Sequence, residues 1–167
     1  FEALGEYHRL FDIYNAYDGM ENLYTVNALQ NGVHRTVTVD ARIIALLQFA
    51  KDMYTKTNGA LHIGMGSVLS LWHTHREAAL QDPANPSVPL DAELTAAAAH
   101  TSFDCLIIDS ENHTVTITDP QMTLDVGAIA KGYAAECVAK ELAARGLSHY
   151  VLNVGGTVRT VGARADG

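Results

Sequence analysis

The sequence predicts an α+β domain in which helices pack on a mainly antiparallel sheet. Helical patterns dominate the chain before residue 102, and short alternating segments typical of strands dominate the part after it. A long helical pattern, over residues 127–145, lies between strand-like segments. Because a doubly wound sheet requires strands and helices to alternate regularly, this order favours α+β.

The first part of the chain predicts two helices joined by a short strand. Residues 2–14 carry an apolar stripe at helical spacing, which a turn signal at residues 18–19 ends. Polar and β-branched residues alternate over residues 34–39, as expected of a strand. Asp40 is a suitable N-cap for the next helix, and an Asn-Gly pair at residues 58–59 closes it.

The middle of the chain predicts further helices around an exposed loop. A glycine-containing segment, 59–67, leads into an apolar helix through residues 68–72. Three prolines within residues 81–89 predict a loop, because proline lacks an N–H and fixes its φ angle. Asp91 is then a suitable cap for a short helix, AELTAAAAH.

Strand patterns follow from residue 103 onward. Residues 103–108, 114–118 and 122–124 are expected to form successive strands, with residues 110–112 as a hairpin turn. After the long helix, YVLNV is expected to be a buried strand, followed by a Gly-Gly pair and another alternating segment. The chain ends in a turn at residues 165–167 while the strand pattern is still open. Since a sheet stopped there would expose an unpaired edge, we expect the chain to continue.

Composition limits the classes of partner. The formal net charge is −8, the pI is near 5.3, and the eleven basic residues are scattered. Binding a nucleic-acid backbone requires a concentrated basic face, so no nucleic-acid partner is expected. Cys105 and Cys137 form no CxxC or zinc-like spacing, which favours buried apolar thiols. No signal peptide or membrane-length apolar run is visible, and because the sequence begins at Phe1 the true N-terminus is expected to be absent.

The segment LDVGAIAKGY, residues 124–133, is the strongest candidate for a binding site. A strand ends at Asp125, two small residues follow, and a helix starts, which leaves free amides and a positive dipole end for an anion. Lys131 can reach a phosphate as a point charge. Asp125 either accepts hydrogen bonds from a ligand or caps the helix. Neither GxxxxGK[ST] nor GxGxxG is present, so a plain strand–turn–helix joint packed at Gly127 stays open.

Other polar motifs are less informative. The Gly-Gly pair at residues 155–156 permits close approach of a ligand, but it favours a tight turn. His73 and His75 are spaced i and i+2, so their rings point apart on a helix, and they are expected to be surface or partly buried side chains. No HExxH or Cys/His cluster predicts zinc, and no GxSxG elbow predicts a serine nucleophile.

Four stretches, in order along the chain, resemble the ApbE family of FAD:protein FMN transferases. LDVGAIAKGYA at residues 124–134 is similar to the family signature, and LNVGG at 152–156 is similar to its glycine-ended strand. TNGALHIGMGSVLSLW at 57–72 and FDIYNAYDGMENLYTVN at 11–27 resemble two further segments. His62 stands where the commonest family form has Asp, and Thr157 where an acidic or amide residue is frequent.

The resemblance implies a T-fold-like domain and a reaction. Such enzymes bind FAD with Mg²⁺, transfer FMN to a threonine or serine hydroxyl of an acceptor protein, and release AMP. The same pocket would also suit an FAD pyrophosphatase, a flavin-binding module without turnover, or a purely structural domain. By resemblance, the residues that contact FAD are Tyr14, Ala60, Leu61, His62, Asp125 and Lys131. The backbone carbonyl of Ala128 is the implied metal ligand, and no catalytic residue is identified in this part of the family sequence.

The resemblance also implies how much of the family domain is present. Family members are about twice as long, so residues 1–167 are expected to be one ApbE-like unit without its N-terminal strand and second half. The side chains that complete the metal site are expected in that second half, so the isolated chain is expected to be inactive. The implied acceptor is a membrane redox-complex subunit, and the implied whole enzyme is an extracytoplasmic, membrane-anchored lipoprotein. The oligomeric state is left open.

Overall fold

The computed structural model describes residues 2–163, which form helices and three small antiparallel sheets. The predicted α+β class is therefore confirmed. The α-helices are α1 (Glu2–Phe11), α2 (Leu23–Asn27), α3 (Ala41–Lys56), α4 (Gly66–Gln81), α5 (Asp91–Ala98) and α6 (Ala130–Ala144), with 3-10 turns η1 (Ile63–Met65) and η2 (Phe103–Cys105). The strands are β1 (Leu29–Gln30), β2 (Val33–His34), β3 (Val37–Thr38), β4 (Leu106–Asp109), β5 (Thr114–Ile117), β6 (Tyr150–Val154) and β7 (Thr157–Val161).

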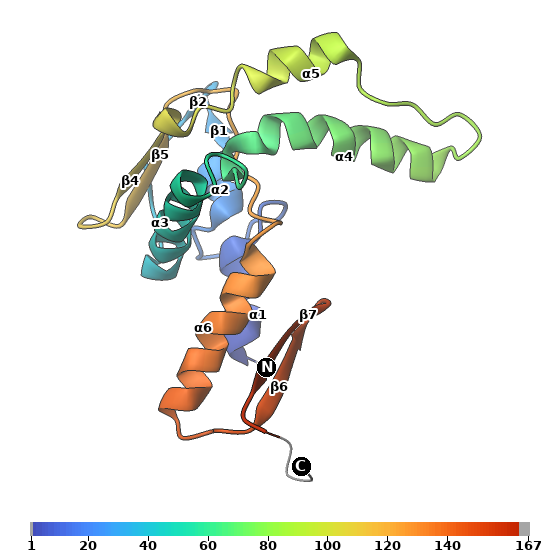
Figure 1. The fold of residues 1–167 in the computed structure, drawn as a ribbon. Helices are drawn as coiled ribbons and strands as arrows, with labels where there is room; N and C mark the ends of the chain where they lie inside the picture. The colour runs from blue at the N-terminus through green and yellow to red at the C-terminus, as the bar shows by residue number, and fades with distance from the viewer. Residues whose placement is uncertain (1, 164–167) are drawn as a thin grey trace.

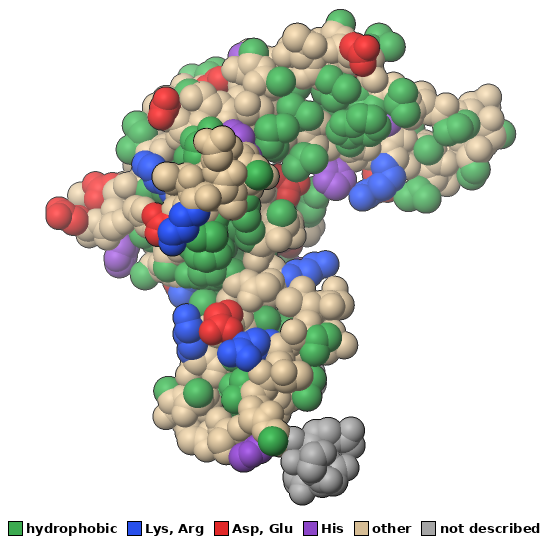
Figure 2. All heavy atoms as spheres, in the orientation of Figure 1, with side chains coloured by type: hydrophobic (Ala, Val, Ile, Leu, Met, Phe, Trp, Pro, Cys, Tyr) green, Lys and Arg blue, Asp and Glu red, His purple; other side chains and the backbone are tan. Residues whose placement is uncertain are grey.

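The elements form a body with two projections (Figure 1). Helices α2 and α3 lie in the centre beside the sheet of order β3-β5-β4, and α1 packs against α6. Helices α4 and α5 extend to one side as an arm, and α6 runs the other way with the β6–β7 hairpin beside it. The space-filling view shows the surface hollowed between the arm and the hairpin (Figure 2).

The core is contributed by the central helices, α6 and the inner face of the three-stranded sheet. Helix α3 shows how the sequence produces it, because Asp40 caps its first turn by accepting a 2.8 Å hydrogen bond from the Arg42 amide. Its buried stripe then packs against the sheet, where Val115 is fully buried. Each such large apolar side chain contributes about 1.5–3 kcal/mol on burial. The most buried large residues include Leu10, Leu23, Ile43, Leu46, Leu47, Ile63, Met122 and Leu124.

Helix α1 ends at Phe11 rather than at residue 14, and the Asp12 carboxylate explains the correction. That carboxylate accepts hydrogen bonds from the Tyr14 and Asn15 amides, at 2.7 and 3.1 Å, and from the Tyr17 hydroxyl at 2.8 Å. The competing local bonds turn the chain out of the helix. Tyr14 is consequently not on the helical stripe, and 62% of it is exposed.

Helix α6 begins at Ala130 rather than at residue 127, again because a carboxylate organises a turn. Asp125 Oδ1 accepts a 2.8 Å bond from the Gly127 amide, and the amides of Ile129 and Ala130 both donate to the Val126 carbonyl. Asp125 therefore holds the turn that precedes the helix and is not its N-cap. The predicted end is confirmed, with Gly146 at φ +85° directly after the last turn.

Several strand predictions are corrected. Residues 34–39 divide into β2 and β3, and residues 103–105 form η2, so β4 begins only at Leu106. Strand β6 is half-exposed, with Val151 65% exposed, because only one face of the hairpin packs on the protein. Residues 122–124 pair with no strand of the described residues, 2–163. The predicted turn at residues 165–167 lies outside the described residues.

The turn predictions agree better with the structure. Residues 82–90 form the predicted loop, and Gly155 and Gly156 make the β6–β7 turn with φ angles of +55° and +93°. Asp91 is the first residue of α5 and not its cap, since the Leu90 amide donates instead to Glu93 Oε2 at 2.8 Å.

Cys105 and Cys137 are free and half-buried rather than buried. Within residues 2–163, no helix has the length and apolar character needed to cross a membrane.

Candidate functional site

The extended segment 123–125 carries the central residue of the candidate site. One of its edges is bonded to the η1 turn, because the Asp125 amide donates to the Ile63 carbonyl at 2.8 Å and the Gly66 amide donates to the Thr123 carbonyl at 3.1 Å. A Cβ on Gly66 would lie 2.5 Å from that Thr123 oxygen, so the approach requires glycine. These two hydrogen bonds hold the backbone of Asp125 in a fixed position.

The turn after Asp125 presents backbone groups to solvent. Gly127 and Ala128 are exposed, although the residues on either side of them are buried. Within residues 2–163, no backbone amide donates to the Ala128 carbonyl. Helix α6 starts two residues later, and its dipole favours negative charge at this end. The amides of Gly127, Ile129 and Ala130 are already bonded within the turn, so the dipole and the open Ala128 carbonyl are what the turn offers to a ligand.

A pocket of about 240 Å³ lies beside this turn, between α1 and α6. Its walls are mostly apolar, and Asp125 and Lys131 lie at its rim. The Lys131 side chain passes the β6–β7 turn, where a Cβ on Gly155 would be 3.6 Å from its ammonium nitrogen. Among the described residues, Lys131 forms no ion pair. The pocket is lined by Leu4, Tyr7, His8, Phe11, Asp12, Ile13, Tyr14, Asp125, Val126, Gly127, Ala130, Lys131, Ala134 and Val154.

A second pocket of about 540 Å³ adjoins the first and shares Ile13, Tyr14 and Asp125 with it. It lies under helix α4, which contributes His73. Basic and histidine side chains are visible along this hollow in the space-filling view (Figure 2). The two pockets are therefore neighbours with Tyr14 and Asp125 in the wall of both, and we refer to them together as the groove.

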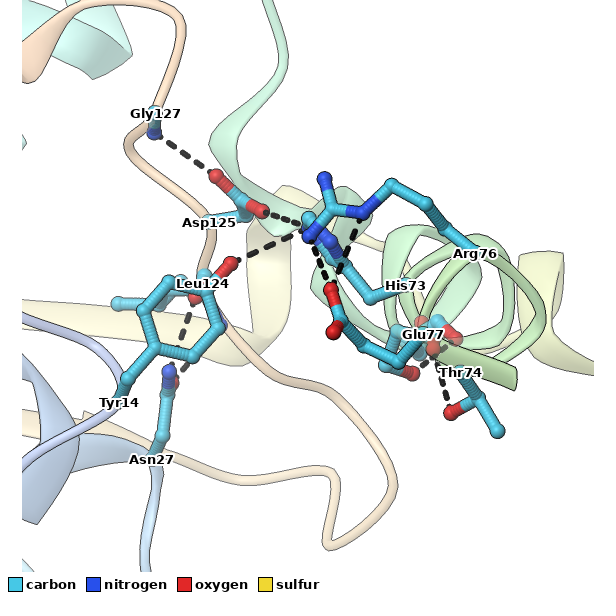
Figure 3. Close-up of polar contacts among 11 residues, drawn as sticks. Tyr14, Asn27, His73, Thr74, Arg76, Glu77, Leu124, Asp125 and Gly127 are labelled. Carbon is cyan, nitrogen blue, oxygen red and sulfur yellow. Dashed lines mark hydrogen bonds and ion pairs between the residues drawn. The ribbon is translucent and has the colours of Figure 1, made fainter. Parts of the chain in front are cut away.

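His73 lines this groove. The sequence did not predict this position for His73. Its Nε2 lies 3.1 Å from the Tyr14 hydroxyl and 3.8 Å from Asp125 Oδ2 (Figure 3). Its neighbour at i+2 points elsewhere, as expected from the spacing, since His75 Nδ1 lies 2.8 Å from the Ser87 hydroxyl. Helical spacing separated the two histidines, but nothing in it showed which of them faces a pocket.

Electrostatics favour a neutral side chain at Tyr14 and an ionised one at Asp12. Partial burial and then the Asp125 carboxylate raise the pKa of Tyr14 above its ordinary value. Burial alone would raise the pKa of Asp12, but hydrogen bonds from Asn15, Tyr14 and Tyr17 outweigh it and hold that pKa below its ordinary value. Asp12 therefore keeps the loop that carries Tyr14 in place at neutral pH.

Ala60, Leu61 and His62 line neither pocket. The His62 ring packs against Tyr54 and Phe103, with centroids 4.8 and 5.5 Å away, and its Nδ1 accepts the Gly64 amide at 3.1 Å. Burial lowers the pKa of His62. The structure gives this histidine a local packing and capping role, and its contact with FAD stays a prediction.

Comparison with known proteins places these features in a family. The sequence profile of the ApbE family matches residues 2–167. The chain belongs to the ApbE family. Its curated relatives include FAD:protein FMN transferases from Klebsiella pneumoniae, 32% identical over 96% of this chain and 50% of the relative, and from Vibrio cholerae, 32% identical over 77% and 36%. This ApbE-family chain thus spans half or less of the length of the relatives named here.

Solved structures agree with the ApbE fold. The flavin transferase ApbE from Vibrio cholerae superposes with a TM-score of 0.80 at 27% identity, over 99% of this chain and 50% of that one. An ApbE protein from Thermotoga maritima superposes with a TM-score of 0.76 at 24% identity, which shows the fold alone. The predicted ApbE-like α+β fold is confirmed over this part of the family domain.

Of the residues that the family resemblance singled out, Tyr14, Asp125 and Lys131 come together in one pocket and Ala128 lies on the adjoining turn. A complete metal site is not formed by them. Within residues 2–163, no three His, Cys, Asp or Glu side chains gather closely enough to hold an ion. Mg²⁺ requires an octahedral oxygen shell, so the Ala128 carbonyl alone does not satisfy it.

Proposed function

We propose that this chain is the FAD-binding part of an FAD:protein FMN transferase. The observation that carries the proposal is the pocket in which the family signature places Asp125 and Lys131 beside an exposed turn at the start of α6. The names of the relatives in the ApbE family support the activity. The substrate would be FAD and the second substrate an acceptor protein with a threonine or serine hydroxyl.

The groove offers complementary groups for a dinucleotide. The Lys131 ammonium and the positive dipole end of α6 favour the pyrophosphate as an anion, because point charge and helix dipole act at the same end. The apolar walls of the first pocket suit a planar ring, and the larger adjoining pocket provides room for the rest of the molecule. Asp125, in the wall of both pockets, is placed to accept hydrogen bonds from the ligand.

The proposed reaction is a phosphoryl transfer. The acceptor hydroxyl oxygen forms a bond to the phosphorus of the FMN half, the bond from that phosphorus to the bridging oxygen breaks, and AMP leaves with that oxygen. The hydroxyl proton is released. Catalysis of this kind depends on positioning and on neutralising phosphate charge, which is the contribution we propose for Lys131.

Mg²⁺ dependence and cellular placement are further parts of the proposal. Divalent metal commonly supplies charge neutralisation in phosphoryl transfer, and no backbone amide of residues 2–163 donates to the Ala128 carbonyl, which leaves this oxygen available. The roles proposed above for Lys131 and Asp125 do not depend on it. An acceptor in a membrane redox complex and an extracytoplasmic lipoprotein enzyme are supported by the family resemblance.

A flavin-binding module without turnover is the second candidate, favoured by the absence of a three-ligand cluster from residues 2–163. Fluorescence titration of the chain with FAD, followed by chromatography of the products in the presence of Mg²⁺, separates the possibilities. We expect saturable binding. AMP with flavin attached to a threonine-containing acceptor indicates transfer, AMP with free FMN indicates a pyrophosphatase, and unchanged bound FAD indicates a module. No FAD binding by a folded chain would contradict the proposal.

A further inference from the structure

We propose that Asn27 is a positioning residue, whose side-chain amide fixes Asp125 by holding the backbone of Leu124. The effect of Asn27 on FAD binding rests on the proposed function. The two hydrogen bonds that Asn27 makes do not depend on it. Asn27 Nδ2 donates to the Leu124 carbonyl at 2.9 Å, and Asn27 Oδ1 accepts from the Leu124 amide at 2.8 Å (Figure 3). The two residues are 97 positions apart in the sequence.

The two bonds satisfy the backbone groups of Leu124 in the way that a neighbouring strand would. On one edge, the segment 123–125 is already bonded to η1 and Gly66. On the other edge no strand from the described part of the chain pairs with it, and the Asn27 amide satisfies both the N–H and the C=O of Leu124. Because Leu124 is 1% exposed, these backbone groups need partners inside the protein. Asn27 thus completes a three-residue segment that is bonded on both edges.

The Asn27 side chain is itself held by a rigid element. It stands at the last residue of α2, whose Leu23 and Val26 are 0% and 1% exposed. Asn22 caps the helix and bonds reciprocally with Thr25. A buried, capped helix therefore presents the amide at a fixed place, which is the condition for positioning another residue.

The residue type at position 27 matters because the clamp needs a donor and an acceptor in one plane. An amide has both, whereas an ionised carboxylate only accepts and an alanine does neither. Asp125 follows directly after the clamped residue, bonds to Gly127 and lies 3.8 Å from His73. Loss of the clamp is expected to loosen this carboxylate and the turn that leads to Lys131.

Amide hydrogen exchange tests the clamp without any ligand. In Asn27→Ala, we expect the Leu124 amide to exchange at least about tenfold faster, because a buried amide loses its acceptor. Amides of Ile43 and Leu47 in α3 should keep their wild-type rates. Asn27→Asp retains the acceptor and remains informative if the alanine variant does not fold; its Leu124 amide should stay protected. Unchanged Leu124 exchange in Asn27→Ala would overturn the inference.

FAD titration then tests whether Asn27 acts through Asp125. We expect Asn27→Ala and Asp125→Asn each to weaken binding on the order of tenfold, and the double variant to be little weaker than Asp125→Asn alone. If Asn27 only stabilised the fold, the fold-changes in FAD affinity of the two single variants would multiply in the double variant. Val115→Ala is the control, because it removes core volume in the sheet and should lower the unfolding midpoint without changing FAD affinity. If the wild-type chain binds no FAD, the proposed function fails, and the exchange measurement alone decides the clamp.

Discussion

Residues 60–62 and 125–131 lie on neighbouring segments, yet their surroundings differ. The two segments are joined by the bond from the Asp125 amide to the Ile63 carbonyl. In the first, His62 is enclosed by Tyr54 and Phe103, and its ring nitrogen serves the adjoining turn. In the second, Lys131 and the exposed turn face a pocket. Two segments that are close in the fold can therefore have different surroundings.

The difference has a local physical cause. The turn with Gly127 and Ala128 is exposed to solvent and stands at the positive end of the α6 dipole, which favours an anion. A histidine between aromatic rings gains packing but loses hydration, which favours its neutral form. The resemblance to the family predicted FAD contacts for both segments, and the packing distinguishes them. The predictions below test that distinction.

The largest effect is expected at Gly66, whose amide bonds to Thr123 next to these two segments. Gly66→Ala places a Cβ 2.5 Å from the Thr123 carbonyl oxygen and hydroxyl, so one backbone must move. We expect a loss of about 3 kcal/mol in the free energy of unfolding, measured in urea. Gly132→Ala is the matched control, since nothing lies within 4 Å of its Cβ position in α6. It should stabilise the protein by up to about 1 kcal/mol. Equal midpoints for the two variants would refute the close approach.

Removing the Lys131 charge should affect binding rather than folding. Lys131→Ala is expected to weaken FAD binding by roughly ten- to a hundredfold, because a charge-assisted contact to phosphate contributes about 1.5–3 kcal/mol. Its unfolding midpoint should stay close to that of the wild type. Lys140→Ala, on the same helix and 4.0 Å from Glu136, provides the control and should bind FAD normally. Equal affinities for the two variants would argue against a phosphate contact at Lys131.

His62→Phe should have the opposite effect to Lys131→Ala, because it should lower stability and leave FAD binding unchanged. The variant keeps an aromatic ring between Tyr54 and Phe103 but loses the bond that His62 accepts from the Gly64 amide. We expect a loss of about 1 kcal/mol in stability, as for a lost helix cap, and unchanged FAD affinity. A large loss of affinity at wild-type stability would instead support the FAD contact predicted by the family resemblance.

The same histidine should make stability depend on pH. Burial lowers the pKa of His62, so below its ordinary value near 6.5 the unfolded chain binds the proton more readily than the folded protein does. The free energy of unfolding should therefore fall as pH drops from 7.5 to 5.5. His62→Phe should show a shallower decrease across that range, and identical slopes would contradict the assignment.

The smallest effect is expected at the Tyr14 hydroxyl. Tyr14→Phe removes its 3.1 Å bond to His73, but the residue is 62% exposed and water can replace the partner. We expect the free energy of unfolding to change by no more than about 0.5 kcal/mol, measured in urea. A loss several times larger would mean that the contact between the two pockets is structural.

Local signals predicted what depends on neighbours in the sequence. The Asp40 cap, the α3 stripe, the proline loop and the glycine that ends α6 all follow from residues within one or two turns. The family signature likewise identified the turn at Asp125. The early end of α1 could not be predicted, because Asp12 draws on several partners in the following loop.

The other features that the sequence did not predict depend on residues far away along the chain. Residues 122–124 have an extended pattern, but one edge bonds to a 3-10 turn and the other to a side chain from α2. His73 faces the groove only because α4 crosses beside the loop that carries Tyr14, 59 positions away. Neither contact leaves a periodic trace in the sequence, so both required the folded structure.

The central claim is that the turn from Asp125 to Lys131 holds FAD. The most direct test is to follow the backbone amide NMR signals of the chain during titration with FAD. We predict saturable shifts at Gly127 and Lys131, and signals at Ala60 and His62 that stay in place. Shifts confined to Ala60 and His62, with Gly127 and Lys131 unchanged, would contradict the account.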